Sequence, residues 1–172
     1  MDIRTAALAC LLLVVPAGCN EGLKLGTKGP PPAQRQAVPE PIKLLLPAAI
    51  RIHPFTGRTF DEAGGIRGVD VHIEAMDGYG DATKAFGEFR FEMYRFVSNS
   101  TDPKGGQIAT WSESLLEPKK NLLHWNKITR TYEFKLQWDR PIPVGQRFVL
   151  MAVFDSPFTE RLTDERVFVA GQ

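Results

Sequence analysis

The 172-residue sequence predicts an all-β fold, an antiparallel β-sandwich of about seven strands that begins near Ile42. In several segments apolar and polar residues alternate, and this period of two is typical of strands with one buried face. Short stretches rich in glycine, proline and aspartate separate these segments. No segment carries a long helical pattern, so we expect strands joined by turns to form two packed sheets.

Three segments show the clearest alternation. In each of them the apolar residues share one face of the expected strand, and we predict that these faces form the core: Val69, Val71, Ile73 and Ala75; Phe89, Phe91 and Met93; Tyr132, Phe134, Leu136 and Trp138. Ile50 and Ile52 show the same spacing over a shorter length. The alternation becomes irregular over residues 94–96, which indicates a bulge or the end of a strand.

Four further segments are expected to be strands. Phe148–Phe154 is apolar throughout, which predicts a central strand covered on both faces. Arg166–Ala170 predicts an edge strand close to the end of the chain. Weaker strand signals lie at Gln107–Trp111 and at Leu122–Trp125.

One short helix is expected, over Asp81–Ala85 or over Ser112–Glu117. The succession of strands is similar to that of immunoglobulin-like and transthyretin-like extracellular domains of bacteria, although the Cys…Trp…Cys arrangement of true immunoglobulin domains is absent. Two other stretches, MDGYGDATKAFGE (76–88) and HWNKITRTYEFKL (124–136), resemble the first calcium loop and the following strand of C2 domains. The sandwich is therefore expected to be immunoglobulin-like or C2-like.

Composition limits the class of protein. The net charge is +1, so no strong field favours a nucleic acid as partner. Apolar residues make up 43% and charged residues 24% of the chain, as in ordinary globular proteins. Both cysteines, Cys10 and Cys19, precede the expected domain, so packing and not a disulfide must hold that domain together.

Residues 1–18 predict a signal peptide. A short start with Arg4 is followed by Ala6–Val15, a run of ten apolar residues. A membrane span needs about 20 such residues, whereas the apolar region of a secretory signal needs about 7–15. The segment is therefore expected to direct export rather than to cross a membrane.

The sequence PAGC at 16–19 resembles the lipobox of bacterial lipoproteins. The resemblance implies cleavage before Cys19, a diacylglyceryl group on its sulfur and acylation of its new amino group, for example with palmitate. Pro16 departs from the pattern, in which Leu or a similar aliphatic residue is usual. The alternative is ordinary cleavage after Ala17, which would leave Cys19 as a free thiol. Asn20, rather than Asp, after the cysteine favours the outer over the inner membrane.

Residues 19–41 are predicted to be a lipid-anchored linker. The segment contains five prolines and three glycines but few large apolar residues. It cannot bury enough apolar surface to offset the entropy of ordering, and its proline-rich half should be extended. The expected organisation is thus a signal peptide (1–18), a linker (19–41) and a β-sandwich domain (42–172).

Asp77, Asp81 and Glu88 are the candidate metal ligands, because oxygen-rich loops with glycines can bind Ca²⁺. Their spacing does not match an EF-hand, and the second aspartate cluster of a C2 site is not evident. The preferred interpretation is a turn between two strands, in which Gly78 and Gly80 supply positive φ angles.

A second polar cluster, Asp70, His72 and Glu74, has residue types that suit Zn²⁺. Side chains at i, i+2 and i+4 lie about 7 Å apart along a strand, so three of them converge poorly on one ion. A solvated polar face is the preferred interpretation.

Trp111 and Trp125 are the candidate ligand-binding residues, because exposed aromatic rings stack on sugars. Their alternative role is in the core, which we expect for Trp138. Motifs of hydrolases, zinc proteases and phosphate-binding loops are missing from the sequence, so we expect neither an enzyme nor a cofactor.

The function that fits these observations best is a membrane-anchored lipoprotein of the bacterial cell envelope. Its β-sandwich would have a non-catalytic role, structural or in contacts with envelope proteins or glycans. The alternative is a ligand-binding module, either carbohydrate-binding or calcium-dependent and C2-like. A hydrolase with an unrecognised site is the third hypothesis.

Overall fold

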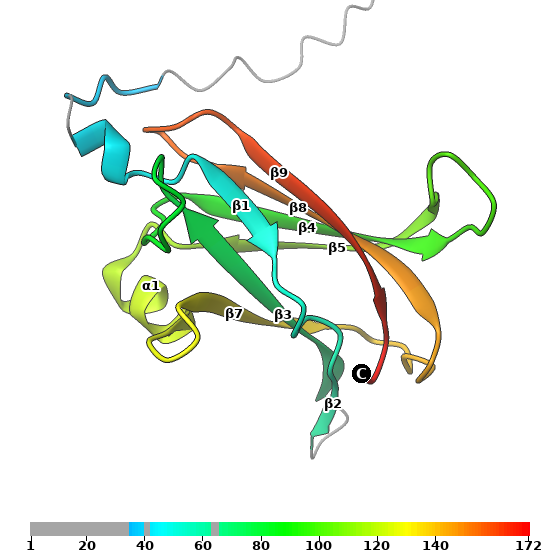
Figure 1. The fold of residues 1–172 in the computed structure, drawn as a ribbon. Coiled ribbons are helices and arrows are strands. Elements are labelled where there is room, and N and C mark those ends of the chain that lie inside the picture. The colour runs from blue at the N-terminus through cyan, green and yellow to red at the C-terminus, as the bar shows by residue number, and fades with distance from the viewer. Residues whose placement is uncertain (1–34, 40–41, 63–65) are drawn as a thin grey trace, which may run out of the picture. The chain divides into compact units, whose positions relative to one another are not determined.

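The structure is a computed structural model that describes residues 35–39, 42–62 and 66–172. Within them, nine strands form two antiparallel sheets, so the predicted all-β sandwich is confirmed (Figure 1). The signal peptide, Cys19 and most of the predicted linker lie outside the described residues. The elements are η1 (Ile42–Leu45), β1 (Ala49–Ile52), β2 (Thr59–Glu62), β3 (Ile66–Met76), β4 (Glu88–Phe96), β5 (Lys104–Ser114), α1 (Pro118–His124), β6 (Trp125–Asn126), β7 (Thr131–Gln137), β8 (Arg147–Asp155) and β9 (Leu162–Val169).

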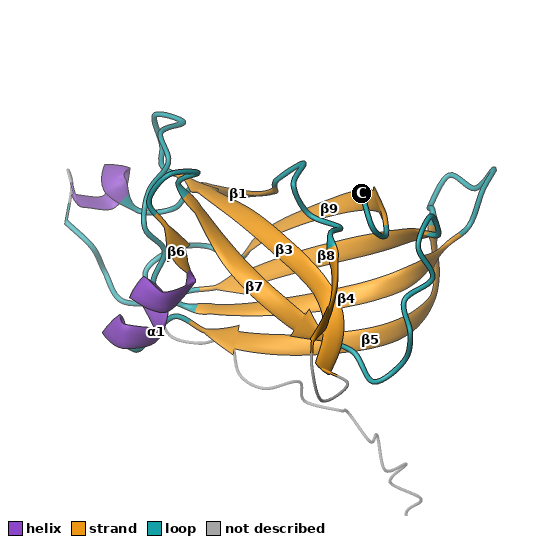
Figure 2. Cartoon of the chain, turned by 90° about the horizontal axis from the view of Figure 1, so that it is seen from below, coloured by secondary structure: helices purple, strands orange, loops and turns teal. Residues whose placement is uncertain are grey.

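The two sheets stack face to face (Figure 2). In the first sheet the strand order is β1-β3-β7-β6, and the short strand β2 pairs with the first part of β3. In the second sheet the order is β5-β4-β8-β9. Because every pairing is antiparallel, turns and short connections collect at the two ends of the sandwich.

The core lies between the sheets and consists of the faces that the alternation predicts. The apolar side chains of β3, β4 and β7 are buried at alternate positions: Val69, Val71, Ile73, Ala75, Phe89, Phe91, Met93, Tyr132, Phe134 and Leu136. Ile50 and Ile52 of β1 join them, and Trp138 packs against this cluster while half-buried. Burial of these side chains supplies the main stabilising free energy of a domain that contains no cysteine.

β8 and β9 also match their predictions. β8 lies between β4 and β9, and both of its faces are buried, including Val149 and Val153 on the face away from the shared core. β9 forms the edge of the second sheet, and starts four residues earlier than the sequence indicates. The irregular alternation after Met93 corresponds to shifts in register between β4 and β5, as expected for a bulge.

The expectations for the helix are wrong. Neither Asp81–Ala85 nor Ser112–Glu117 is helical, and α1 instead takes up most of Leu122–Trp125, for which the sequence suggests a strand. Pro118 occupies the first turn of α1, where its fixed φ suits a helix and its missing N–H is not needed. Of the described helices, none is long and apolar enough to cross a membrane.

Candidate functional site

The acidic turn between β3 and β4 is a closed hydrogen-bonded loop. The Oδ1 atom of Asp77 accepts hydrogen bonds from the backbone N–H groups of Tyr79 at 2.9 Å and Asp81 at 3.1 Å. Gly80 adopts a φ of +86°, so it provides the positive φ expected of this turn, whereas Gly78 does not. This geometry explains the sequence of the turn without a bound ion.

The three candidate metal ligands do not come together. Glu88 is the first residue of β4 and lies opposite Asp155 of β8 in the sheet. Asp77 and Asp81 belong to the turn, where a carboxylate oxygen of Asp77 is already engaged by two backbone groups. Throughout the described part of the chain, no group of three or more His, Cys, Asp or Glu residues is placed to hold a metal ion.

Replacing Asp77 by alanine should lower the free energy of unfolding by about 1 kcal/mol, because two backbone N–H groups lose their acceptor. Asp77→Asn keeps an acceptor oxygen and should unfold like the parent chain in urea. We expect millimolar Ca²⁺ to leave the melting temperature of all three proteins unchanged. A calcium-dependent rise in the parent that Asp77→Asn abolishes would show instead that the turn binds the ion.

Trp111 and Trp125 lie at different places on the sandwich. The indole N–H of Trp111, in β5, donates to the carbonyl of Gln137 at 2.5 Å. Trp125, in β6, lies against Tyr132 with ring centroids 5.0 Å apart, and the Nζ atom of Lys84 is 4.6 Å from its ring centre. Trp125 pairs with Tyr132, whereas Trp111 is bonded to Gln137. These two residues of β7 are five positions apart, which corresponds to about 17 Å along the strand. Both side chains are half-buried against the core, and they do not form one stacking platform.

The polar face of β3 pairs with its neighbouring strands. The guanidinium of Arg51 donates to Glu74 through Nε at 3.0 Å and through Nη2 at 2.5 Å. The Nδ1 atom of His72 lies 3.5 Å from a carboxylate oxygen of Glu133. Asp70, His72 and Glu74 are half-buried rather than fully solvated. Glu74 and His72 thus face partners on two different strands, and the three side chains do not form a metal site, as the spacing along a strand predicts.

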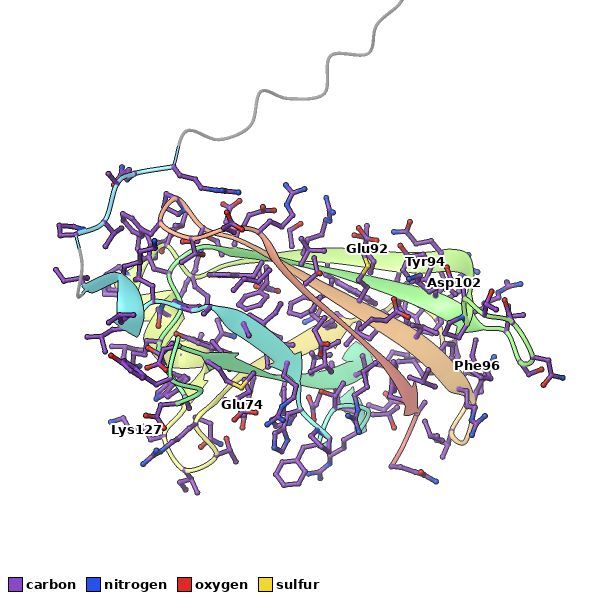
Figure 3. All side chains as sticks on the ribbon, turned by 45° about the horizontal axis from the view of Figure 1, so that its top comes forward. Glu74, Glu92, Tyr94, Phe96, Asp102 and Lys127 are labelled. Atoms are coloured by element: carbon purple, nitrogen blue, oxygen red, sulfur yellow. The ribbon has the colours of Figure 1, made fainter. Side chains whose placement is uncertain are left out.

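One end of the sandwich, here named the α1 end, carries several connections. It consists of residues 42–48, 77–87, 115–130 and 156–161, because β3, β5 and β8 run toward it while β1, β4, β7 and β9 run away from it. Figure 1 shows η1, α1 and the β3–β4 connection together at this end. In Figure 3, Lys127 marks the α1 end, and Phe96 and Asp102 mark the opposite end.

A buried polar cluster holds the α1 end together. The hydroxyl of Tyr132 accepts a hydrogen bond from the backbone N–H of Ala85 at 2.9 Å, and Asn121 Oδ1 lies 3.0 Å away as its acceptor. The amide of Asn121 donates to the carbonyls of Ala85 at 2.6 Å and Leu115 at 3.1 Å. Burial raises the pKa of Tyr132, so the hydroxyl stays protonated. This cluster ties α1 to β7 and to the β3–β4 connection.

η1 is fastened to the same connection. The hydroxyl of Thr83 donates to the carbonyl of Leu45 at 2.9 Å, and the N–H of Gly78 donates to the carbonyl of Leu44 at 3.3 Å. A groove of about 750 Å³ opens beside η1, between residues 35–38 and 158–162. The last part of the predicted linker therefore contacts the domain, since the N–H of Gln36 donates to the carbonyl of Pro157 at 2.7 Å.

The α1 end exposes many large apolar side chains. They include nine of the thirteen exposed large apolar residues in the described part of the chain: Ile42, Leu44, Leu45, Tyr79, Phe86, Leu116, Leu122, Leu123 and Ile128. Ile128 is 93% exposed and Leu123 is 81% exposed. Monomeric proteins expose single apolar residues routinely, but a concentration of this kind on one region indicates a binding surface.

Basic side chains lie among the apolar ones. Residues 77–87 and 115–130 contain three acidic residues, Asp77, Asp81 and Glu117, and five exposed basic ones, Lys84, Lys119, Lys120, Lys127 and Arg130. The pKa of Lys84 is lowered by desolvation and, in addition, by the positive charge of Lys127. The α1 end therefore combines an apolar surface with an excess of positive charge.

The sequence contains a signal for this site that the alternation of apolar residues does not reveal. A proline is typical of the first turn of a helix, and Pro118 stands here between Glu117 and the segment KKNLLH. The two exposed leucines follow within that helix. The contacts of Asn121 could not be found in this way, because they join residues from three separate segments.

Comparison of the chain with protein-family models, with curated proteins and with solved structures finds no match. The function is therefore inferred from the residues themselves and from the geometry described above.

Proposed function

We propose that this chain is a lipid-anchored protein of the bacterial cell envelope whose β-sandwich has a non-enzymatic, structural or protein-binding role. The observation that carries the proposal is Cys19, which directly follows an apolar run and three small or turn-forming residues. No cysteine follows it in the chain, so it has no disulfide partner within the domain. Asn20 after the cysteine favours the outer membrane.

The order of the strands supports an immunoglobulin-like sandwich as the exposed module. If β1, β3, β4, β5, β6, β7, β8 and β9 are named A, B, C, C′, D, E, F and G, one sheet is A-B-E-D and the other is C′-C-F-G. Immunoglobulin-type sandwiches have these sheets. Such a module suits a binding or structural role, because its connections are displayed at the two ends of a rigid scaffold.

The membrane anchor is tested by Cys19→Ser. We expect this variant to lose metabolic labelling with a fatty acid and to leave the membrane fraction, because several acyl chains each contribute about 0.8 kcal/mol per buried CH₂. Cys10→Ser is the matched control, since Cys10 lies in the predicted signal peptide and should not affect labelling. A mature protein that begins at Gly18 and carries an unmodified Cys19 thiol would overturn the proposal.

A further inference from the structure

We propose that the α1 end is a membrane-docking surface that contacts anionic lipid headgroups and the adjoining acyl region. This inference rests on the proposed function, because it assumes that Cys19 holds the chain at a membrane. It goes further by naming the part of the domain that touches the lipid, and so the orientation of the sandwich on the membrane.

The path of the described chain begins at this surface. η1 leads directly into β1, and its carbonyls are hydrogen-bonded to Gly78 and Thr83 of the α1 end. Gln36 contacts Pro157, which also belongs to this end. A tether from Cys19 therefore joins the domain at the α1 end. Even fully extended, at about 3.6 Å per residue, the segment from Asn20 to Pro41 spans no more than about 80 Å.

The chemistry of the surface suits the interface of a bilayer. Leu122, Leu123 and Ile128 project from α1 and from the β6–β7 connection, where they can enter the boundary between headgroups and acyl chains. Lys84 and Lys127 are both exposed basic residues of this surface, one in the β3–β4 connection and the other in the β6–β7 connection. Anionic lipids attract such residues, with about 1 kcal/mol for each lysine or arginine near the surface.

A protein partner would favour a different composition. Protein interfaces are enriched in Trp, Tyr and Arg at their centres, and they are depleted in lysine. Four of the five exposed basic residues in residues 77–87 and 115–130 are lysines, and Trp125 is half-buried beneath Lys84. Flexible lysines around protruding leucines match a fluid anionic surface better than a fixed protein surface.

The test places an environment-sensitive NBD fluorophore on a cysteine at the α1 end of the full chain. Leu123→Cys provides the probe site, and Val144→Cys is its matched control, because Val144 is 74% exposed and lies in the β7–β8 connection at the opposite end. Cys10→Ala removes one background thiol. The purified proteins are combined with vesicles of phosphatidylglycerol or of phosphatidylcholine.

We expect NBD at position 123 to shift to the blue and brighten on phosphatidylglycerol vesicles, and less on phosphatidylcholine. The probe at position 144 should not change. Lys84→Gln combined with Lys127→Gln should weaken docking about thirtyfold, the equivalent of about 1 kcal/mol per lysine. Equal responses at both positions, or no response at position 123, would overturn the inference. A blue shift that depends on protein concentration without vesicles would also overturn it, in favour of a second copy of the chain.

The labelling control separates this inference from the proposed function. The Cys10→Ala chain without an added cysteine takes up NBD only if the Cys19 thiol is free, which would show that the anchor is absent. In that case Cys19→Ser is added to both probe variants, and the same vesicle measurement still decides whether the α1 end docks. A lipidated chain with an unresponsive probe would retain the anchor and refute the docking surface.

Discussion

Replacing Phe134 by alanine is expected to lower the free energy of unfolding by about 3–5 kcal/mol, because the ring fills the centre of the core. Phe134 is 1% exposed, and its ring lies 5.3 Å from that of Phe89, 5.0 Å from Phe91 and 4.7 Å from His124. Alanine would leave a cavity bordered by both sheets, and rigid neighbours can fill it only in part. For a domain of this size the melting temperature should fall by roughly 10–20 °C.

Two variants control for this measurement in urea and thermal unfolding. Phe134→Leu keeps most of the apolar volume, so its free energy of unfolding should fall less than that of the alanine variant. It should therefore yield a folded protein even if alanine does not. Phe55→Ala removes the same side chain from a site that is 59% exposed, and it should be close to neutral. If Phe134→Ala lowers the free energy of unfolding no more than Phe55→Ala does, the two sheets do not pack through the ring of Phe134.

The position of Phe134 in the core could be predicted because β7 has one buried and one outward face. Burial imposes a period of two on residues 131–137, and the same period predicts β3 and β4. β8 is predicted instead from its uninterrupted apolar run, because both of its faces are covered. β2 was missed because its four residues, TFDE, include only one apolar side chain, and β6 because it has only two residues. Neither strand therefore shows a period of two. Their pairing with β3 and β7 depends on tertiary contacts that local patterns do not encode.

The candidate site could be predicted less well than the fold. The turn that contains Asp77 and Asp81 is predicted correctly, because the hydrogen bonds that select turn residues are short-range. The α1 end, by contrast, depends on which connections the sandwich topology brings to one end. Leu123 and Tyr79 are 44 residues apart in sequence, and no local pattern links them. Their shared location follows only from the directions of β3 and β5.

The second large effect is expected from Tyr132→Phe, which removes one buried oxygen atom. The backbone N–H of Ala85 loses its acceptor, and Asn121 Oδ1 loses its donor at 3.0 Å. Ala85 is 1% exposed, so water cannot easily replace the hydroxyl. Unsatisfied buried polar groups cost about 1–3 kcal/mol, and we expect a loss of this size in urea denaturation.

The three tyrosines of the chain provide an internal series for this prediction. Tyr79 is 70% exposed, and the hydroxyl of Tyr94 bonds to Glu92 on the outer face of β4, so the corresponding phenylalanine variants should lose about 1 kcal/mol or less. Amide exchange should accelerate at Ala85 and in α1 for Tyr132→Phe alone, because of the three tyrosine hydroxyls only that of Tyr132 contacts both Ala85 and Asn121 of α1. If the docking surface depends on a rigid α1, the same variant should also weaken the NBD response at position 123 on phosphatidylglycerol vesicles. An equal free energy of unfolding for the phenylalanine variants of Tyr79, Tyr94 and Tyr132 would mean that the hydroxyl of Tyr132 does not hold the α1 end together.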